Sequence, residues 1–284
     1  MQKSAILTLS CTDKPGLVSR ISGFIHSHFG NIISLNEFVD QNSGTFFLRI
    51  EWTLDHFELT DDDLKLAFKK EMREIDASWE IHFSDRRLRI ALFVSKYDHC
   101  IRDILWRHSM GEFDVDIPII ISNHIDMEKI ANRYQIPFYH FPLTKENKKK
   151  QEDAEIRILE ENQIHTIILA RYMQILSAEF VAHYPNRIIN IHHSFLPAFI
   201  GGNPYRQAFE RGVKIIGATS HFVTGELDEG PIIVQETVNI SHRDKIDDLI
   251  RRGRDLERMV LSKAIKLQAE KRILVSGHKT VVFE

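Results

Sequence analysis

An amide, an imidazole and a carboxylate occur close together in the C-terminal half of the sequence. Asn190 and His192 belong to the stretch Asn190–Pro197, and Asp228 follows in the stretch Gly225–Pro231. These group types can polarise a carbonyl, transfer a proton and orient the proton carrier, and they need no serine or cysteine nucleophile. The set therefore suits acyl transfer to water or to an amine.

The spacing of Asn190 and His192 predicts that both side chains face one pocket. A strand is expected over residues 187–190, and ligands gather beyond the carboxyl ends of strands in an open parallel sheet. Residues two apart in an extended segment share a side, so Asn190 and His192 face the pocket while Ile191 faces the core. Asp228 falls in a turn between two later strands, where a carboxylate can be held beside a neighbouring strand end.

The length and composition of the chain indicate a globular protein with two domains. A chain of 284 residues exceeds what one hydrophobic core usually serves. Apolar residues make up 43% and charged residues 27%, and the formal net charge of −3 gives no field that would favour nucleic acid. No apolar run approaches the roughly 20 residues that span a bilayer, so membrane insertion is not expected. Cys11 and Cys100 have no metal-ligand spacing, which makes a reducing cytoplasm the expected compartment.

Residues 1–84 alternate between strand and helix patterns. Strands are expected over 4–10, 31–39, 44–54 and 78–83, and helices over 17–29 and from Asp61 to Met72. The resulting order βαββαβ predicts a ferredoxin-like domain.

This order, with the turn Asp13–Val18 after the first strand, resembles an ACT regulatory domain over residues 1–84. The resemblance implies an amino-acid effector site formed by Asp13, Gly16, Leu17 and Asn31. It also implies that these domains pair, so a homodimer or homotetramer is expected. Independently, Gly16 would let the backbone approach a small carboxylate at a helix start. The alternative is that Gly16 only builds the turn and Asn31 only ends the helix.

After a charged join, residues 87–284 indicate a doubly wound, mostly parallel α/β sheet. Strands are expected over 88–94, 115–121, 137–141, 164–170 and 187–190, with helices between them. The runs 117–121 and 166–170 lack alternation, as expected for strands that helices cover on both faces. Further strands over 212–223 and 231–238, compatible with antiparallel pairing, a helix over 245–270 and short strands over 273–275 and 280–283 complete the domain.

Two segments of this second domain, Asn190–Pro197 and His221–Pro231, resemble the folate-dependent formyltransferase fold family. That family carries Asn-x-His near a Ser-Leu-Leu-Pro-like loop, and then His-x-Val and Asp-x-Gly-Pro. The corresponding residues are Asn190, His192, Ser194–Pro197, His221–Val223 and Asp228–Pro231. The resemblance covers residues 87–284 and implies that Asn190, His192 and Asp228 are catalytic.

Within that family the chain is most similar to the deformylases, which join an ACT domain to this catalytic domain. Ser95–Cys100 stands where transferases to glycinamide ribonucleotide carry a Gly-Ser-Asn phosphate-binding loop, and His193 and residues 198–205 also resemble the deformylases. The resemblance implies hydrolysis of 10-formyltetrahydrofolate to tetrahydrofolate and formate, which balances one-carbon pools and supplies formate for purine synthesis. It implies neither a cofactor nor a metal. The alternative is a folate-dependent formyltransferase to an amine.

The expected mechanism assigns a role to each polar group. The Asn190 amide donates to the formyl oxygen as it becomes an oxyanion, and His192 supplies a second donor. Asp228 positions the attacking water, accepts its proton directly or through His192, and helps return a proton to N10. The resemblance places the pteridine near residues 171–176 and 223–228, with substrate contacts from Arg171, Tyr172, Met173, Leu176, His221, Val223 and Leu227. The alternatives are that residues 171–176 only pack beneath a strand end and that His221 tunes Asp228 or only packs.

Three other readings have less support in the sequence. A zinc hydrolase is disfavoured because His192 and His193 are adjacent and diverge in an extended segment. A serine hydrolase using Ser194 lacks the nucleophile-elbow pattern. A non-catalytic amino-acid sensor that only binds folate would not require the full amide, imidazole and carboxylate set.

Overall fold

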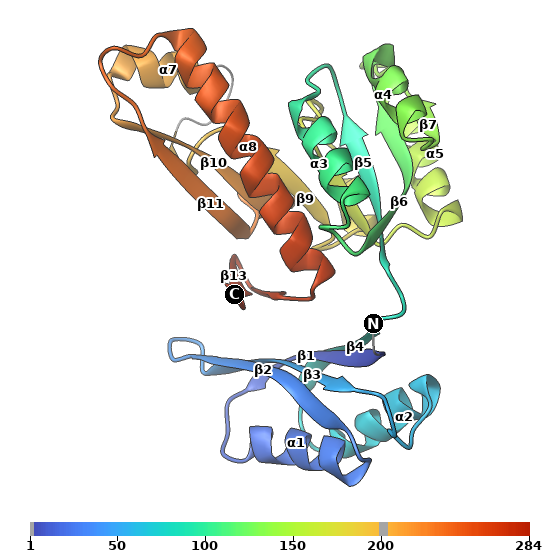
Figure 1. Ribbon diagram of the computed structural model, residues 1–284. Helices are drawn as coiled ribbons and strands as arrows, with labels where there is room; N and C mark the ends of the chain where they lie inside the picture. Colours follow the sequence, from blue (N-terminus) through green and yellow to red (C-terminus); the bar gives the residue numbers. More distant parts are fainter. Residues whose placement is uncertain (1–2, 199–203) are drawn as a thin grey trace. The chain divides into compact units, whose positions relative to one another are not determined.

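The computed structural model describes residues 3–198 and 204–284. The chain forms two compact units (Figure 1). The first contains the residues up to Arg87 together with Glu270–Ser276 and Val281–Glu284, and the second contains Leu88–Ala269 and Gly277–Thr280. Most residues after Glu270, expected in the 87–284 domain, thus cluster with the first unit, because Leu274 and Phe283 pack against Phe47.

The first unit has the expected βαββαβ order. Its elements are β1 (Ser4–Thr12), α1 (Leu17–Ser27), β2 (Asn31–Asp40), β3 (Thr45–Thr53), α2 (Asp61–Glu71) and β4 (Ala77–Phe83), and the C-terminal strands β12 (Ile273–Ser276) and β13 (Lys279–Val282) form a separate two-stranded sheet. The four-stranded sheet has the order β2-β3-β1-β4, with all neighbours antiparallel. This is the ferredoxin-like arrangement that the sequence pattern predicts.

Amphipathic patterning explains how the two helices cover this sheet. Helix α1 buries Leu17, Ile21, Phe24 and Ile25, a spacing that gathers apolar side chains on one helical face. These residues share one core with the buried strand residues, including Leu7 and Ile50. Helix α2 begins at the side-chain cap of Thr60, which satisfies one of the free N–H groups of its first turn.

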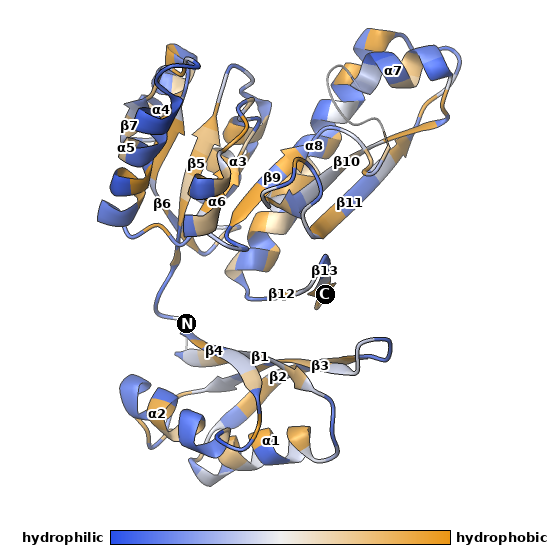
Figure 2. Ribbon diagram, turned by 180° about the vertical axis from the view of Figure 1, so that it is seen from behind, coloured by the Kyte–Doolittle hydropathy of each residue, from blue (hydrophilic) through white to orange (hydrophobic). Residues whose placement is uncertain are grey.

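The second unit contains a seven-stranded sheet with helices on both faces. Its strands are β5 (Leu88–Val94), β6 (Val115–Ser122), β7 (Phe138–His140), β8 (Thr166–Leu169), β9 (Ile188–His192), β10 (Ile215–Phe222) and β11 (Ile232–Asn239). Its helices are α3 (His99–Ser109), α4 (Glu128–Arg133), α5 (Lys148–Glu161), α6 (Ala178–His183), α7 (Pro204–Arg211) and α8 (Ile246–Ala269), with a 3₁₀ turn at Ile125–Met127. Helices α3 and α8 lie in front of the sheet in Figure 1, and α6 lies in front in the reverse view of Figure 2.

The strand order β11-β10-β9-β8-β5-β6-β7 confirms the doubly wound, mostly parallel sheet. Strands β5 to β9 are parallel, and β10 and β11 are antiparallel. The chain winds outward in both directions from β5 and β8, so the switch point lies between these neighbours, where ligands of such sheets bind. The strands β5 and β6 are mainly hydrophobic (Figure 2), in keeping with strands that are covered on both faces.

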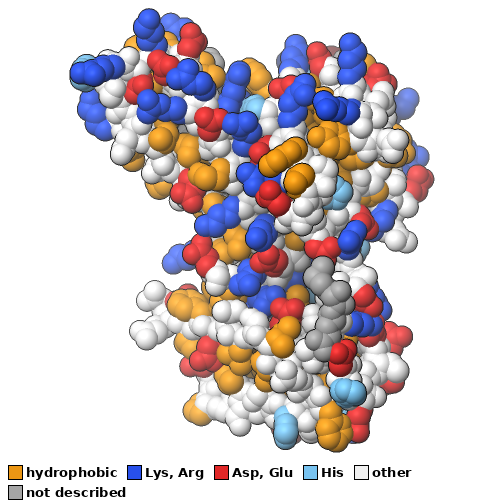
Figure 3. Space-filling model, in the orientation of Figure 1, with side chains coloured by type: hydrophobic (Ala, Val, Ile, Leu, Met, Phe, Trp, Pro, Cys, Tyr) orange, Lys and Arg blue, Asp and Glu red, His pale blue; other side chains and the backbone are white. Residues whose placement is uncertain are grey.

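Two surface properties bear on partners. In the face drawn in Figure 3, acidic and basic side chains are interspersed. Within the described part of the chain, no helix combines the length and the apolar composition needed to span a membrane.

Candidate active site

Strand β9 carries Asn190 and His192 at its carboxyl end. The strand continues to His192, two residues beyond the expected end, because the antiparallel ladder with β10 pairs His192 with Thr219. Asn190 and His192 line one cleft, as the alternation of side chains predicts, and the buried Ile191 borders the same cleft.

Strand β10 places His221 directly across the ladder from Asn190. The His221 Nδ1 atom lies 2.9 Å from the carbonyl oxygen of Phe222, and a carbonyl only accepts hydrogen bonds, so Nδ1 carries the proton. Nε2 of His221 then accepts from the Asn190 amide nitrogen at 3.2 Å. This contact fixes which end of the Asn190 side chain is the donor.

Asp228 lies in the turn between β10 and β11 and contacts both imidazoles. Its Oδ2 is 3.2 Å from His192 Nδ1, and its Oδ1 is 3.7 Å from His221 Nε2. Burial raises the pKa of Asp228, but the interactions with His192 and His221 outweigh it and hold the pKa well below its usual range. Asp228 is therefore a carboxylate at any physiological pH.

The backbone of this turn explains the Asp-x-Gly-Pro motif. Asp228 has a left-handed conformation with φ of 57°, which aspartate tolerates better than most residues. A Cβ at Gly230 would lie 1.7 Å from the Phe222 carbonyl oxygen. A glycine is needed there because the turn packs directly against the end of β10.

His192 keeps one ring nitrogen available. With Nδ1 held by Asp228, its Nε2 has no hydrogen-bond partner among the described residues. A buried nitrogen without a partner is unfavourable, and a substrate or water at the cleft would supply the missing bond. His192 is thus oriented by one nitrogen and can exchange a proton at the other.

The cleft measures about 500 Å³, a size suited to a cofactor or a small substrate. It brings together every residue predicted for catalysis or substrate binding: Asn190, His192, Asp228, Arg171, Tyr172, Met173, Leu176, His221, Val223 and Leu227. Residues 199–203 of the loop that resembles the deformylases lie outside the described residues.

The predicted substrate-binding residues divide into two groups. Tyr172 and Leu176 are buried in the core beside α5 and α6, whereas Met173 and Leu227 are more than half exposed at the cleft. Arg171 behaves differently, because its side chain is buried and its Nε lies 3.4 Å from Glu257 Oε2. Its guanidinium also lies over the Tyr97 ring at 5.1 Å.

Sequence reasoning missed a cluster of side chains in the same cleft. His99, Tyr205 and Glu257 line it together with Arg171. His99 Nε2 lies 2.8 Å from Glu257 Oε2, and the Tyr205 hydroxyl donates to Glu257 Oε1 at 2.5 Å. No local pattern indicates this cluster, because its members come from α3, the end of β8, α7 and α8.

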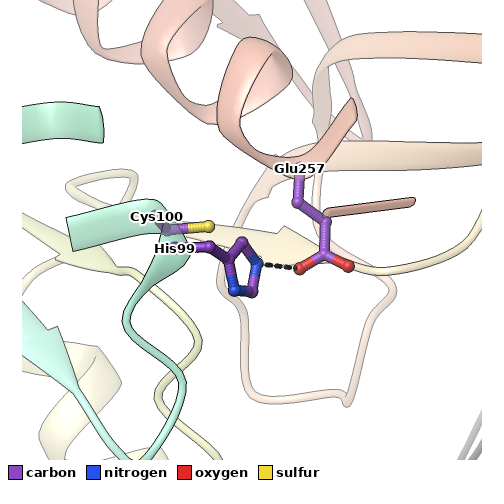
Figure 4. A group of neighbouring side chains, drawn as sticks. All are labelled: His99, Cys100 and Glu257. Carbon is purple, nitrogen blue, oxygen red and sulfur yellow. Dashed lines mark hydrogen bonds and ion pairs between the residues drawn. The ribbon is translucent and has the colours of Figure 1, made fainter. Parts of the chain in front are cut away.

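His99, Cys100 and Glu257 offer three ligand types within 4.8 Å of one another (Figure 4). The arrangement does not favour a cation, because Arg171 already brings a positive charge to Glu257. Burial and the Glu257 charge raise the pKa of the Cys100 thiol well above its usual value, whereas a metal ligand would have to be a thiolate. The cluster is better described as a buried ionic network.

The four predicted effector residues lie in the first unit. Gly16 has φ of 89° and precedes α1, and Asn31 is exposed at the start of β2. The Leu17 side chain is packed in the core, so only its main chain could contact a ligand. A cavity between α1 and α2, lined by residues such as Arg20 and Lys70, includes none of the four.

Comparisons with known proteins find some relatives over the whole chain and others over its catalytic domain. The family model for formyl transferases matches residues 88–265. A formyltetrahydrofolate deformylase of Synechocystis is 54% identical over 99% of this chain and 98% of its own length. The crystal structure of a formyltetrahydrofolate deformylase from Pseudomonas syringae matches with a TM-score of 0.98 and 41% identity, over 100% of this chain and 95% of that one. A phosphoribosylglycinamide formyltransferase from Anaplasma phagocytophilum matches with a TM-score of 0.63 and 32% identity, over 70% of this chain and 96% of its own.

Proposed function

This chain belongs to the formyltetrahydrofolate deformylases and hydrolyses 10-formyltetrahydrofolate, and we propose that the reaction takes place in the cleft around Asn190, His192 and Asp228. The sequence-based resemblance is thereby confirmed for family and reaction. We assign the site to this cleft because the three groups converge there, with Asp228 bonded to His192 and close to His221.

Asn190 stabilises the oxyanion. Its amide nitrogen has two hydrogens, and one of them is engaged by His221 Nε2. The other is free for the formyl oxygen, which gains negative charge when water adds to the formyl carbon. A donor that is already oriented before the reaction lowers the barrier most effectively.

His192 carries the proton. Its Nδ1 donates to Asp228, so Nε2 can take a proton from the attacking water and the carboxylate stabilises the resulting imidazolium. His192 then gives this proton to N10 as the C–N10 bond breaks. The products are tetrahydrofolate and formate, and one water molecule is consumed. The sequence leaves two routes open, in which Asp228 accepts the proton of water directly or through His192. The route proposed here is the one through His192.

The folate lies along the wall formed by Tyr172, Met173 and Leu176. These side chains are apolar or aromatic and border the cleft beside Asn190. The turn that carries Leu227 and Asp228 borders the cleft too, and its main-chain groups suit the polar edge of a pteridine. Such a combination of apolar walls with few oriented polar groups is typical of small-molecule sites.

The function is tested by incubating the purified protein with 10-formyltetrahydrofolate and no amine. We expect stoichiometric release of formate and tetrahydrofolate. Absence of formate until an amine is added would identify a transferase instead.

We further propose that the first unit regulates this activity through an amino acid bound near Gly16 and Asn31. The left-handed Gly16 at the start of α1 offers unpaired N–H groups to a carboxylate. Pairing of two such units is supported by the edge strand β2, on which Ile33 and Phe38 are about half exposed.

The two cysteines are buried and unpaired, which supports a reducing cytoplasm as the compartment. There the released formate would feed purine synthesis.

A further inference from the structure

The cleft is bordered on opposite faces of the sheet by walls of different chemistry. Tyr172 and Leu176 belong to the core cluster that includes Phe180 of α6. Glu257 belongs to α8, which packs against β9, β10 and α3. Helices α8 and α6 lie on opposite faces (Figures 1 and 2). With folate along the apolar wall, an acceptor must reach the formyl carbon from the side of α3 and α8.

On that side the cleft is lined by the ionic network of His99, Arg171, Tyr205 and Glu257, here named the charged wall. Both carboxylate oxygens of Glu257 are engaged, one by Tyr205 and the other by His99 and Arg171. Figure 4 shows His99 of α3 and Glu257 of α8 meeting across the gap between their helices. The charges therefore compensate one another, and Glu257 retains no free oxygen with which to bind an amine.

The backbone is adapted at two points to build the charged wall. A Cβ at Gly253 would lie 2.1 Å from the Tyr205 hydroxyl oxygen, so a glycine on α8 makes the room through which Tyr205 reaches Glu257. Arg171 has φ of 63°, a conformation in which a residue with a Cβ is unfavourable. This strained conformation accompanies the placement of a guanidinium beside Glu257.

The phosphoribosylglycinamide formyltransferase from Anaplasma phagocytophilum shares the fold of this catalytic domain. The fold alone therefore does not decide whether the formyl group passes to water or to an amine. We propose that the charged wall is the specificity device that excludes amines and leaves water as the acceptor. The proposal rests on the hydrolysis proposed above. Water is small enough to reach the formyl carbon past the charged wall, whereas a primary amine carries substituents that need the space held by Arg171 and Tyr205.

Transfer of the formyl group to an amine would need no reactant other than the amine and 10-formyltetrahydrofolate. The amine nitrogen would bond to the formyl carbon, the C–N10 bond would break, and the proton lost by the amine would reach N10 through His192. Opening the wall should therefore convert part of the hydrolysis into transfer.

Two variants open the wall. Arg171→Gly removes the guanidinium and suits the left-handed backbone, and Tyr205→Phe removes one hydrogen bond to Glu257. Arg254→Ala is the matched control, because Arg254 lines the same cleft but is not one of the four residues of the charged wall. Each folded variant is given 10-formyltetrahydrofolate with and without glycinamide, and formate and N-formylglycinamide are both quantified.

We expect the ratio of N-formylglycinamide to formate to rise about tenfold or more in Arg171→Gly, less in Tyr205→Phe, and not in Arg254→Ala. An unchanged ratio in both wall variants, or an equal rise in the control, would overturn the proposal. Loss of formate release in a folded Arg171→Gly protein would also overturn it, because Arg171 would then serve hydrolysis itself. If Arg171→Gly does not fold, Tyr205→Phe decides. Failure of the wild type to release formate without an amine refutes the proposed function instead.

Discussion

His192 Nδ1 lies 3.2 Å from Asp228 Oδ2, although His192 ends β9, Asp228 lies in the turn after β10, and the whole of β10 separates them in the sequence. The other oxygen of the same carboxylate faces His221, which in turn accepts from Asn190. One carboxylate therefore fixes the proton carrier directly and is linked to the oxyanion donor through a second imidazole.

Replacing Asp228 with Asn should reverse the tautomer of His192. An amide can donate to Nδ1, which moves the ring proton to Nε2 and removes the base. We expect kcat for formate release to fall by about 10²- to 10⁴-fold, with a melting temperature close to that of the wild type. Asp244→Asn, which alters a partly buried ion pair with Arg252 outside the cleft, is the control. A kcat within a factor of about two of the wild type would remove Asp228 from the proton path.

Gly230→Ala should abolish activity by displacing the turn that carries Asp228. The added methyl group would collide with the Phe222 carbonyl oxygen at 1.7 Å, so the end of β10 and the turn must separate. Gly23→Ala, in α1 of the first unit, meets no atom within 4 Å and is the control. We expect loss of formate release and a lower melting temperature for the first variant only. Equal activity of both variants would show that the turn does not need glycine.

A buried carboxyl group should make stability depend on pH. Glu155 is fully buried with no hydrogen-bond partner on either oxygen among the described residues, and burial raises its pKa from 4.5 to about 8. Between these values the unfolded chain ionises while the folded protein keeps the proton, so the free energy of unfolding falls as pH rises, by at most about 1.4 kcal/mol per pH unit.

Glu155→Gln cannot ionise and should lack this slope. We expect the variant to gain stability over the wild type from pH 5 to 8, measured as the difference between their melting temperatures. A difference that stays constant across this range would mean that Glu155 ionises in the folded protein.

An amino acid should bind to the first unit if the ACT resemblance extends to its ligand. We expect calorimetry of the full chain to detect binding of at least one common amino acid, and Asn31→Ala to weaken it. No heat with any common amino acid would refute the effector, while formate release would be unaffected by that result.

Sequence patterns predict the helices and strands of this protein better than they predict contacts between residues far apart in the sequence. Period-two alternation explains why Asn190 and His192 share a side, and uniformly apolar runs identify the buried parallel strands. The bond between His192 and Asp228 depends on how β9 and β10 pair, which no local pattern records.

The charged wall shows the same limit. Glu257 reads as part of a solvated helix face, since its neighbours Asp255 and Arg258 are charged. Only packing of α8 against α3 brings it to His99, and the left-handed Arg171 is unexpected because such a conformation favours glycine.

The central claim is that Asn190 donates to the oxyanion formed from the formyl group. The most direct measurement compares kcat and KM of wild type and Asn190→Ala for 10-formyltetrahydrofolate without an amine. We predict a fall in kcat of about 10²- to 10³-fold with little change in KM, because the bond forms fully only in the transition state. Unchanged turnover in Asn190→Ala would contradict the account.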